Sequence, residues 1–262
     1  WDWRMPEEHN RVLIDHISEL LFVHSDSIRR NLEQDGVRGE TYVVGTTAAD
    51  AVEQNLEIAQ RKSDALERTG VTAGEYFLAT CHRQENVDDK GNLTSILTAF
   101  ERCGEQYGVP VVFPVHPRTT RRIREFELES FREGMQHVRF TDPVGYLDFL
   151  KLLSGARLLL TDSGGGVQEA CILGVPCVTL RISIEWVETV EIGANILSGP
   201  SEDRIVAGVD EFVRNPREWS NPFGDGNTGR RIIDIVEQAI RDGIPSPGIP
   251  EQLGLVPNRA GE

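Results

Sequence analysis

Residues 161–170 read Thr-Asp-Ser-Gly-Gly-Gly-Val-Gln-Glu-Ala, and the apolar residues 156–160, Ala-Arg-Leu-Leu-Leu, come directly before them. The apolar segment is typical of a short buried strand. Helical character runs from Val167 to Leu173 and ends at Gly174-Val175-Pro176. The glycines are therefore predicted to lie on a strand-to-helix turn. Such a turn directs unpaired backbone N–H groups and the positive end of a helix dipole to one point, which favours a bound phosphate.

Polar groups around this turn suit a nucleotide. Ser163 adds a hydroxyl to the backbone of Gly164 and Gly165, and Glu169 lies about one and a half turns into the helix, where it could accept hydrogen bonds from a ribose. A tight structural turn without a ligand is the alternative. The next apolar segment ends at Arg181, whose planar guanidinium can bind two phosphate oxygens at once. Together these features favour a nucleoside diphosphate.

Strand and helix patterns alternate on both sides of the turn. Strands are expected at 76–80, 111–115, 138–140, 158–160, 177–180 and 194–197, with helices at 92–107, 119–133 and 146–153. This alternation predicts an α/β fold, a Rossmann-like doubly wound parallel sheet with helices on both faces. Ligands of such sheets bind beyond the carboxyl ends of the strands. His82, His116, Ser163 and Arg181 each follow a predicted strand end, so they are expected to share one cleft.

The flanking segments are less regular. Upstream, helices are predicted at 6–17, 27–34 and 48–67, with strands ending near Val23 and Val44. The glycine-rich break at 69–74 indicates a domain boundary. A final helix is expected at 229–240, and the Pro-rich residues 243–262 are expected to form a poorly ordered tail.

The composition limits the class of protein. The 262 residues are 39% hydrophobic, without an apolar run of membrane-spanning length or an N-terminal export signal, which predicts a soluble cytoplasmic protein. Cys81, Cys103, Cys171 and Cys177 have no metal-binding spacing and are expected to be buried thiols. No His, Cys or Asp pattern of a metal site and no dinucleotide fingerprint occur, so neither a metal nor another cofactor is expected.

The charge balance is strongly acidic. The formal net charge is −15, which argues against nucleic-acid or anionic-membrane partners because both require a basic surface. Lysine occurs only at positions 62, 90 and 151, and arginine supplies the other cations. An acidic, lysine-poor surface predicts adaptation to high salt, that is, a halophilic protein. An ordinary acidic protein from a GC-rich genome is the alternative.

An ordered set of motifs runs from the first residues to about Ile240. The set consists of Met5–Arg11, Cys81–Asn86, Pro114–Pro117, Asp162–Gly165 with Gln168-Glu169 and Gly174-Val175-Pro176, Arg181 with Ile184–Val190, and Asn221–Gly226. In order and approximate spacing it resembles the non-hydrolysing UDP-N-acetylglucosamine 2-epimerases. The resemblance implies reversible inversion at C2 of the sugar to UDP-N-acetylmannosamine, through elimination and re-addition of UDP, for cell-surface or glycoprotein glycan synthesis.

The resemblance also implies a domain organisation. Members of that family have two Rossmann-like domains in a glycosyltransferase-B arrangement. In this chain, residues 1–68 correspond to the last part of the first domain, and residues 75–242 to a complete UDP-binding domain. The chain alone is accordingly expected to lack epimerase activity. A homodimer is expected for the full-length protein, with a second UDP-sugar as an activator.

The resemblance assigns roles to particular residues. Glu7 is expected to transfer a proton and His82 to contact the leaving UDP, as the catalytic pair; capping of a helix N-terminus would otherwise explain Glu7. The substrate is expected to contact Asn10, Arg11, Arg83, His116, Tyr146, Phe149, Ser163, Gly164, Gly165, Glu169, Arg181 and Glu185. His116 is also placed where relatives bind the activator, and Phe149 beside the uracil.

The motifs do not decide which sugar the substrate carries. Where the family commonly has Thr-Glu-Arg-Pro-Glu, this chain has Ile184-Glu185-Trp186-Val187-Glu188. A UDP-diacetamido uronic acid is therefore an alternative substrate. A glycosyltransferase of the same fold and a non-catalytic UDP-binding fragment are further alternatives.

Overall fold

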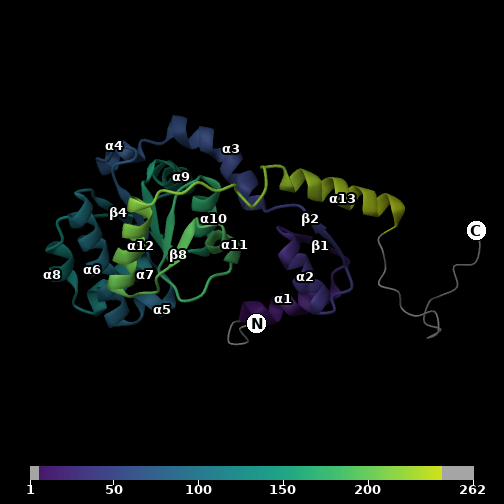
Figure 1. The fold of residues 1–262 in the computed structure, drawn as a ribbon, viewed down its shortest axis with the longest axis horizontal. Helices are drawn as coiled ribbons and strands as arrows, with labels where there is room; N and C mark the ends of the chain where they lie inside the picture. Colours follow the sequence, from purple (N-terminus) through teal and green to yellow (C-terminus); the bar gives the residue numbers. More distant parts are fainter. Residues whose placement is uncertain (1–5, 244–262) are drawn as a thin grey trace, which may run out of the picture. The chain divides into compact units, whose positions relative to one another are not determined.

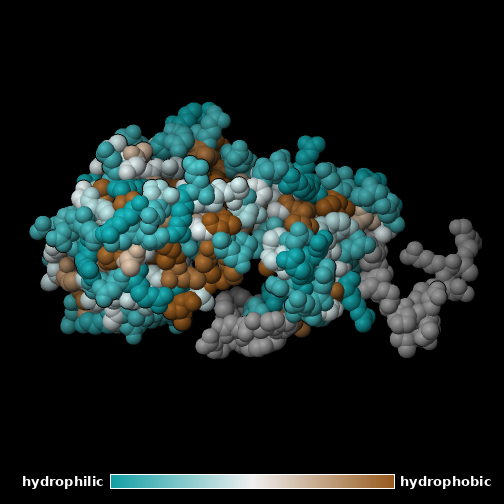
Figure 2. Space-filling view, viewed as in Figure 1, coloured by the Kyte–Doolittle hydropathy of each residue, from teal (hydrophilic) through white to brown (hydrophobic). Residues whose placement is uncertain are grey.

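The computed structural model describes residues 6–243; the side chains of Pro6 and Glu7, and the predicted Pro-rich tail from position 244 onward, lie outside the described part. The chain divides into two compact units, one formed by the residues up to Asp50 with those from Phe223 onward, the other by Ala51–Pro222. The predicted domain ranges 1–68 and 75–242 do not coincide with these units, and they stay a prediction about homologous halves. Hydrophilic side chains cover most of the visible face (Figure 2).

The smaller unit contains a two-stranded parallel sheet and the helices around it. Its elements are α1 (Pro6–Ile17), β1 (Leu20–Val23), α2 (Asp26–Gln34), β2 (Glu40–Val43) and α13 (Thr228–Asp242), and α3 (Thr47–Lys62) begins in it. The last helix joins this unit because the buried Asp50 accepts hydrogen bonds from the backbone N–H groups of Thr228 and Gly229, at 2.9 and 2.6 Å. The first N–H groups of a helix have no partner within the helix, and an acidic side chain that accepts from them stabilises the helix N-terminus.

The larger unit is built on six parallel strands in the order β5-β4-β3-β6-β7-β8. The strands are β3 (Phe77–Thr80), β4 (Val111–Pro114), β5 (Val138–Thr141), β6 (Leu158–Thr161), β7 (Cys177–Thr179) and β8 (Asn195–Leu197). Numbered within the unit, this is the order 3-2-1-4-5-6 of a Rossmann fold, with its topological switch point between β3 and β6. Thr80 is the register partner of Thr161, so the two strands end side by side.

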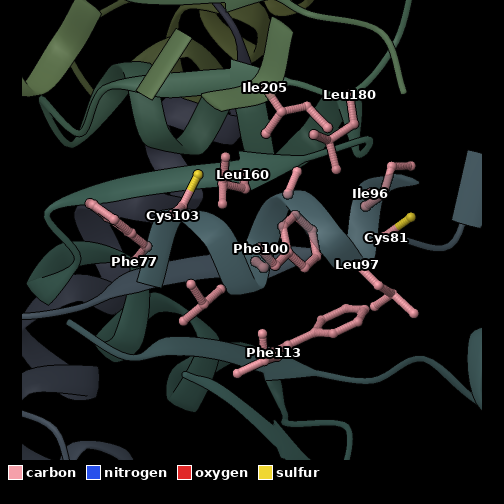
Figure 3. Close-up of a cluster of buried hydrophobic side chains, with 14 of the residues drawn as sticks. Phe77, Cys81, Ile96, Leu97, Phe100, Cys103, Phe113, Leu160, Leu180 and Ile205 are labelled. Carbon is pink, nitrogen blue, oxygen red and sulfur yellow. The ribbon is translucent and has the colours of Figure 1, made fainter. Parts of the chain in front are cut away.

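Helices cover both faces of this sheet (Figure 1). They are α4 (Ala65–Thr69), α5 (Gln84–Val87), α6 (Lys90–Tyr107), α7 (Pro117–Glu125), α8 (Glu129–Glu133), α9 (Tyr146–Gly155), α10 (Gly164–Ile172), α11 (Val187–Glu191) and α12 (Glu202–Arg214). The strands alternate between two cores, since Phe77 packs with α6 and α12 whereas Leu78 packs with α9 and α10. In the first core Phe100 meets Phe113 edge to face, with ring centroids 5.5 Å apart (Figure 3).

Most predicted elements are confirmed, and the differences concern the helices. The helix predicted at 48–67 is interrupted because the Ser63 hydroxyl accepts a hydrogen bond from the backbone of Ala65, which competes with helix continuation. The helix predicted at 119–133 is divided at Glu127, whose φ is 57°. The helix α12 and the short helices α5 and α11 were not predicted.

The four cysteines are free and buried, as predicted. Burial raises the pKa of each thiol above its ordinary value, so these side chains are inert buried groups.

Candidate functional site

A cavity of about 380 Å³ lies in the larger unit, beyond the ends of β3, β4 and β6. Its walls are Thr80, Cys81, His82, Pro114, His116, Pro143, Val144, Phe149, Ser163, Gly165, Gly166 and Glu169. Six of the residues predicted for substrate contact or catalysis line it: His82, His116, Phe149, Ser163, Gly165 and Glu169. The switch point of a doubly wound sheet is where ligands of this fold bind.

The glycines form the first turn of α10 itself, whereas the sequence predicted that they precede the helix. Ser163 is the N-cap, and its hydroxyl oxygen accepts a hydrogen bond from the Gly166 N–H at 3.3 Å. This capping bond uses the serine oxygen as an acceptor and leaves its O–H proton for a ligand. The N-terminus of α10 borders the cavity, as a phosphate site at a helix end requires.

Asp162 organises the loop that carries His82. The carboxylate is fully buried and accepts hydrogen bonds from the backbone N–H of His82 at 2.9 Å, that of Arg83 at 2.8 Å and the side-chain amide of Asn86 at 3.1 Å. Its Oδ1 also lies 3.4 Å from Nδ1 of His82. A carboxylate beside Nδ1 favours the tautomer that carries its proton there, which makes Nε2 the acceptor in the neutral ring.

The two predicted histidines lie together. The rings of His82 and His116 have centroids 5.3 Å apart. Nδ1 of His116 accepts a hydrogen bond from the Arg118 N–H at 3.1 Å, which caps α7. Burial is the main cause that lowers the pKa of His82, with Asp162 acting in the opposite direction. His82 is accordingly neutral at pH 7 before a ligand binds.

Glu169 and two aromatic residues of α9 form another wall. Burial raises the pKa of Glu169 to about 6, although a hydrogen bond from the Tyr146 hydroxyl lowers it in part. Tyr146 as a residue is 41% exposed and adjoins the cavity through this bond. Phe149, three residues further along α9, lines the cavity directly. An aromatic face beside a partly buried carboxylate is a suitable site for a nucleoside.

A second cluster surrounds Arg181, just beyond β7. Nη1 of Arg181 donates to both carboxylate oxygens of Glu185, at 2.8 and 2.9 Å, and Nε donates to Glu85 at 3.1 Å. The Glu185 carboxylate lies near Gly164, where an added Cβ would be 3.2 Å from Oε2. These contacts place Arg181 and Glu185 beside the N-terminus of α10. Burial acts to raise the pKa of Glu185, but the hydrogen bonds from Arg181 and the positive charges nearby outweigh it, so the net pKa is lowered and the carboxylate is ionised.

The remaining predicted residues are placed as follows. The backbone of Arg83 is held by Asp162, and its charge acts on Glu185. Glu7, Asn10 and Arg11 belong to α1 in the smaller unit, where the side chain of Glu7 is not described. Arg11 pairs with Glu8 and Asp15, at 2.8 Å each. The role predicted for each of these residues stays a prediction.

Sequence reasoning missed Asp162, Asn86 and Trp186. Asp162 follows the buried strand 158–161 directly, and a carboxylate at that point was a usable signal. Trp186 occupies the position where the family commonly has arginine, and its indole N–H donates to the Gly164 carbonyl at 2.8 Å. Its partner was not foreseeable, because the two residues are far apart in the sequence.

Two features are absent from residues 6–243. No helix there is long and apolar enough to cross a membrane. No cluster of three or more histidine, cysteine or acidic side chains in that range is arranged to hold a metal ion.

Comparison with known proteins identifies the family. The profile of the family described as UDP-N-acetylglucosamine 2-epimerase matches residues 1–237. The chain is 44% identical over 239 residues to the UDP-N-acetylglucosamine 2-epimerase of Methanocaldococcus jannaschii, covering 90% of this chain and 65% of that protein. It is 37% identical to the UDP-2,3-diacetamido-2,3-dideoxy-D-glucuronate 2-epimerase of Pseudomonas aeruginosa, covering 90% of this chain and 64% of the relative.

Solved structures agree. The crystal structure of the M. jannaschii UDP-GlcNAc 2-epimerase in complex with UDP-GlcNAc and UDP superposes with a TM-score of 0.82 at 43% identity, over 90% of this chain and 66% of that one. This chain belongs to the UDP-N-acetylglucosamine 2-epimerase family. The predicted α/β fold class, of glycosyltransferase-B type, is confirmed. The chain spans about two thirds of the length of these relatives.

Proposed function

We propose that this chain carries the UDP-binding part of an enzyme that inverts C2 of UDP-N-acetylglucosamine to give UDP-N-acetylmannosamine. The observation that carries the proposal is that one cavity, at the β3/β6 switch point, combines a capped helix N-terminus, His82 and Glu169. The M. jannaschii relative, crystallised with UDP-GlcNAc and UDP, supports the same ligand class. Synthesis of cell-surface or glycoprotein glycans is the proposed use of the product.

The proposed reaction is an elimination followed by re-addition. A base removes the proton from C2 while the C1–O bond to UDP breaks, which leaves a C1–C2 double bond in the sugar. UDP then adds back to C1 after a proton reaches the opposite face of C2. Glu7 is proposed for proton transfer, as the family resemblance implies. The first turn of α10, Arg181 and His82 are proposed to stabilise the charge on the departing diphosphate.

Uptake of deuterium tests the reaction. We would join to this chain the part of the M. jannaschii relative that it does not cover, because the chain alone is expected to be inactive. In heavy water, the chimera is expected to incorporate deuterium at C2 of UDP-N-acetylglucosamine. Loss of the C2 proton signal in the NMR spectrum measures this exchange. A chimera that binds UDP but exchanges no C2 proton in any UDP-sugar would contradict an epimerase and favour a UDP-binding module.

A UDP-diacetamido uronic acid is the second candidate substrate. The observation in its favour is Trp186, which stands at the position where the family commonly has arginine. Its indole N–H donates a hydrogen bond to the Gly164 carbonyl. The Pseudomonas aeruginosa relative named for that activity is 37% identical. The same exchange experiment with both nucleotide sugars separates the candidates by their kcat/KM ratio.

Glu169 is expected to lower the stability of the empty protein and to strengthen UDP binding. Its folded-state pKa is raised to about 6, because the buried carboxyl is favoured in its protonated form. The protonated carboxyl costs the folded state nothing below about pH 4.5, and the ionised carboxylate destabilises it as the pH rises through 6. Glu169→Gln should therefore raise the free energy of unfolding by about 1–2 kcal/mol at pH 8 and hardly change it at pH 4. Urea unfolding at the two pH values measures this.

UDP binding should change in the opposite direction. Glu169→Ala and Ser163→Ala are each expected to weaken UDP binding about tenfold in calorimetry, since each removes one polar contact. Glu57→Gln, a change at an exposed residue of α3, is the matched control. Equal UDP affinity in all four proteins would show that the cavity is not the UDP site.

We further propose a salt-adapted surface. The melting temperature is expected to rise by several degrees between low and molar potassium chloride, because counterions screen the repulsion of a net charge of −15. A flat or falling melting temperature would favour genome composition as the reason for the scarcity of lysine. We also propose a cytoplasmic location, a homodimer and activation by a second UDP-sugar.

A further inference from the structure

The short helix α5 follows the loop that carries His82, and its polar side chains bond other elements of the larger unit. Glu85 accepts a hydrogen bond from Arg181 at 3.1 Å, and Asp88, the C-cap of α5, pairs with two arginines of α7. A helix of four residues is not stable by itself. These long-range bonds therefore hold α5 in place and connect it to the strand ends around the cavity proposed to bind UDP.

Asn86 is a buried polar residue of this helix, with 1% of its surface exposed. Its side-chain nitrogen lies 3.1 Å from Oδ2 of Asp162 and 3.0 Å from the carbonyl oxygen of Leu180. A carboxylate and a carbonyl only accept hydrogen bonds, so the amide group of Asn86 donates one hydrogen to each. Both amide hydrogens are used, and the residue joins the position just after β6 to the position just after β7.

The two partners of Asn86 each adjoin a group that is proposed to contact the diphosphate. Asp162 fixes the backbone of His82, and Leu180 directly precedes Arg181 in the chain. His82 follows β3 and Arg181 follows β7, so the two groups come from different strands of the sheet. A shift of either strand end would change the separation of His82 and Arg181. Asn86 bonds both ends at once and thereby opposes such a shift.

The bond to Asp162 is not needed to satisfy that carboxylate. Asp162 also accepts hydrogen bonds from the backbone N–H groups of His82 and Arg83. What the Asn86 amide adds is the connection from Asp162 to Leu180. Asn86 is not among the residues that line the cavity, so it can act on a ligand only through its partners.

We propose that Asn86 is a positioning residue of the UDP site, which holds His82 and Arg181 at the separation that the two phosphates of UDP require. The inference rests on the function proposed above. Charge-assisted hydrogen bonds have narrow distance ranges, so a ligand that bonds both groups is sensitive to their separation. UDP has two phosphates and can bond both groups, whereas UMP is short enough to bond one without the other.

The ratio of UDP affinity to UMP affinity tests the proposal. In Asn86→Ala, UDP binding measured by calorimetry should weaken about tenfold and UMP binding by less than about twofold. Asn86→Ser should lower the ratio nearly as far, because one hydroxyl proton can bond Asp162 or Leu180 but not both. The loss of stability should be smaller in Asn86→Ser than in Asn86→Ala, and thermal unfolding of each variant measures it.

Asn195→Ala is the matched control. Asn195 is also a buried amide of the larger unit, with 2% of its surface exposed, and it bonds the hydroxyl groups of Thr179 and Thr189. Neither threonine lines the cavity. Asn195→Ala should lower the melting temperature and leave the ratio of UDP to UMP affinity unchanged. A purely structural role of Asn86 predicts the same result for Asn86→Ala.

A double-mutant cycle with Arg181→Ala gives a second readout. If Asn86 acts by placing Arg181, Asn86→Ala should weaken UDP binding by less than about twofold in a protein that already lacks the Arg181 side chain. Losses that multiply independently would overturn the proposal, as would an unchanged ratio of UDP to UMP affinity in Asn86→Ala and Asn86→Ser. Failure of the unmodified chain to bind UDP would instead overturn the UDP site itself and this inference with it.

Discussion

Asp162→Ala is expected to destabilise the larger unit by about 2–5 kcal/mol. The buried carboxylate accepts from two backbone N–H groups and one amide, and each buried donor that loses its partner costs about 1–3 kcal/mol. Urea unfolding measures the loss. Asp203→Ala, at a side chain that is 90% exposed, is the surface control and should change stability by less than about 0.5 kcal/mol.

A second readout separates the effect on His82 from simple loss of stability. Asp162 raises the pKa of His82 against the effect of burial. In Asp162→Asn, which keeps the shape of the side chain, the pKa of His82 should fall further below its ordinary value. NMR titration of the histidine ring measures it. An unchanged His82 pKa in a folded Asp162→Asn protein would mean that Asp162 only braces the loop.

The sheet was predictable because its strands are short apolar runs between clear helices. The alternation of strand and helix predicts a parallel sheet. Both faces of that sheet are buried, which explains why three consecutive strand positions, Leu158, Leu159 and Leu160, are all occupied by apolar residues. Helix boundaries were less predictable. The interruption at Ser63 depends on a side-chain hydrogen bond, and the one at Glu127 on a left-handed backbone conformation. Neither is evident from hydrophobic periodicity.

The candidate site was predictable where it depends on strand ends. Residues that directly follow β3, β4 and β6 meet in one cavity because parallel strands bring their carboxyl ends together. Contacts made over long sequence distances were not predictable. The bond from Trp186 to Gly164 and that from Arg181 to Glu85 follow from packing of the loops, which no local pattern encodes.

Arg181→Ala is expected to weaken UDP binding about 30- to 100-fold, the effect of losing one strong charge-assisted diphosphate contact. Nε and Nη1 of Arg181 are held by Glu85 and Glu185 in the described structure, and among residues 6–243 Nη2 donates to no side chain. The two carboxylates thus fix the guanidinium plane while one edge remains for a phosphate. Protein stability should change little, because Glu85 and Glu185 are 52% and 44% exposed and become hydrated.

Arg181→Lys distinguishes a fork from a point charge. Lysine keeps the charge but cannot bond both glutamates and a phosphate in one plane, so UDP affinity should fall nearly as far as in Arg181→Ala. Arg61→Ala, at an exposed arginine of the same unit, should bind UDP like the unmodified chain. If Arg181→Ala retains full UDP affinity, the residue instead braces Glu185 against the first turn of α10, and the phosphates are held by that helix and Ser163 alone.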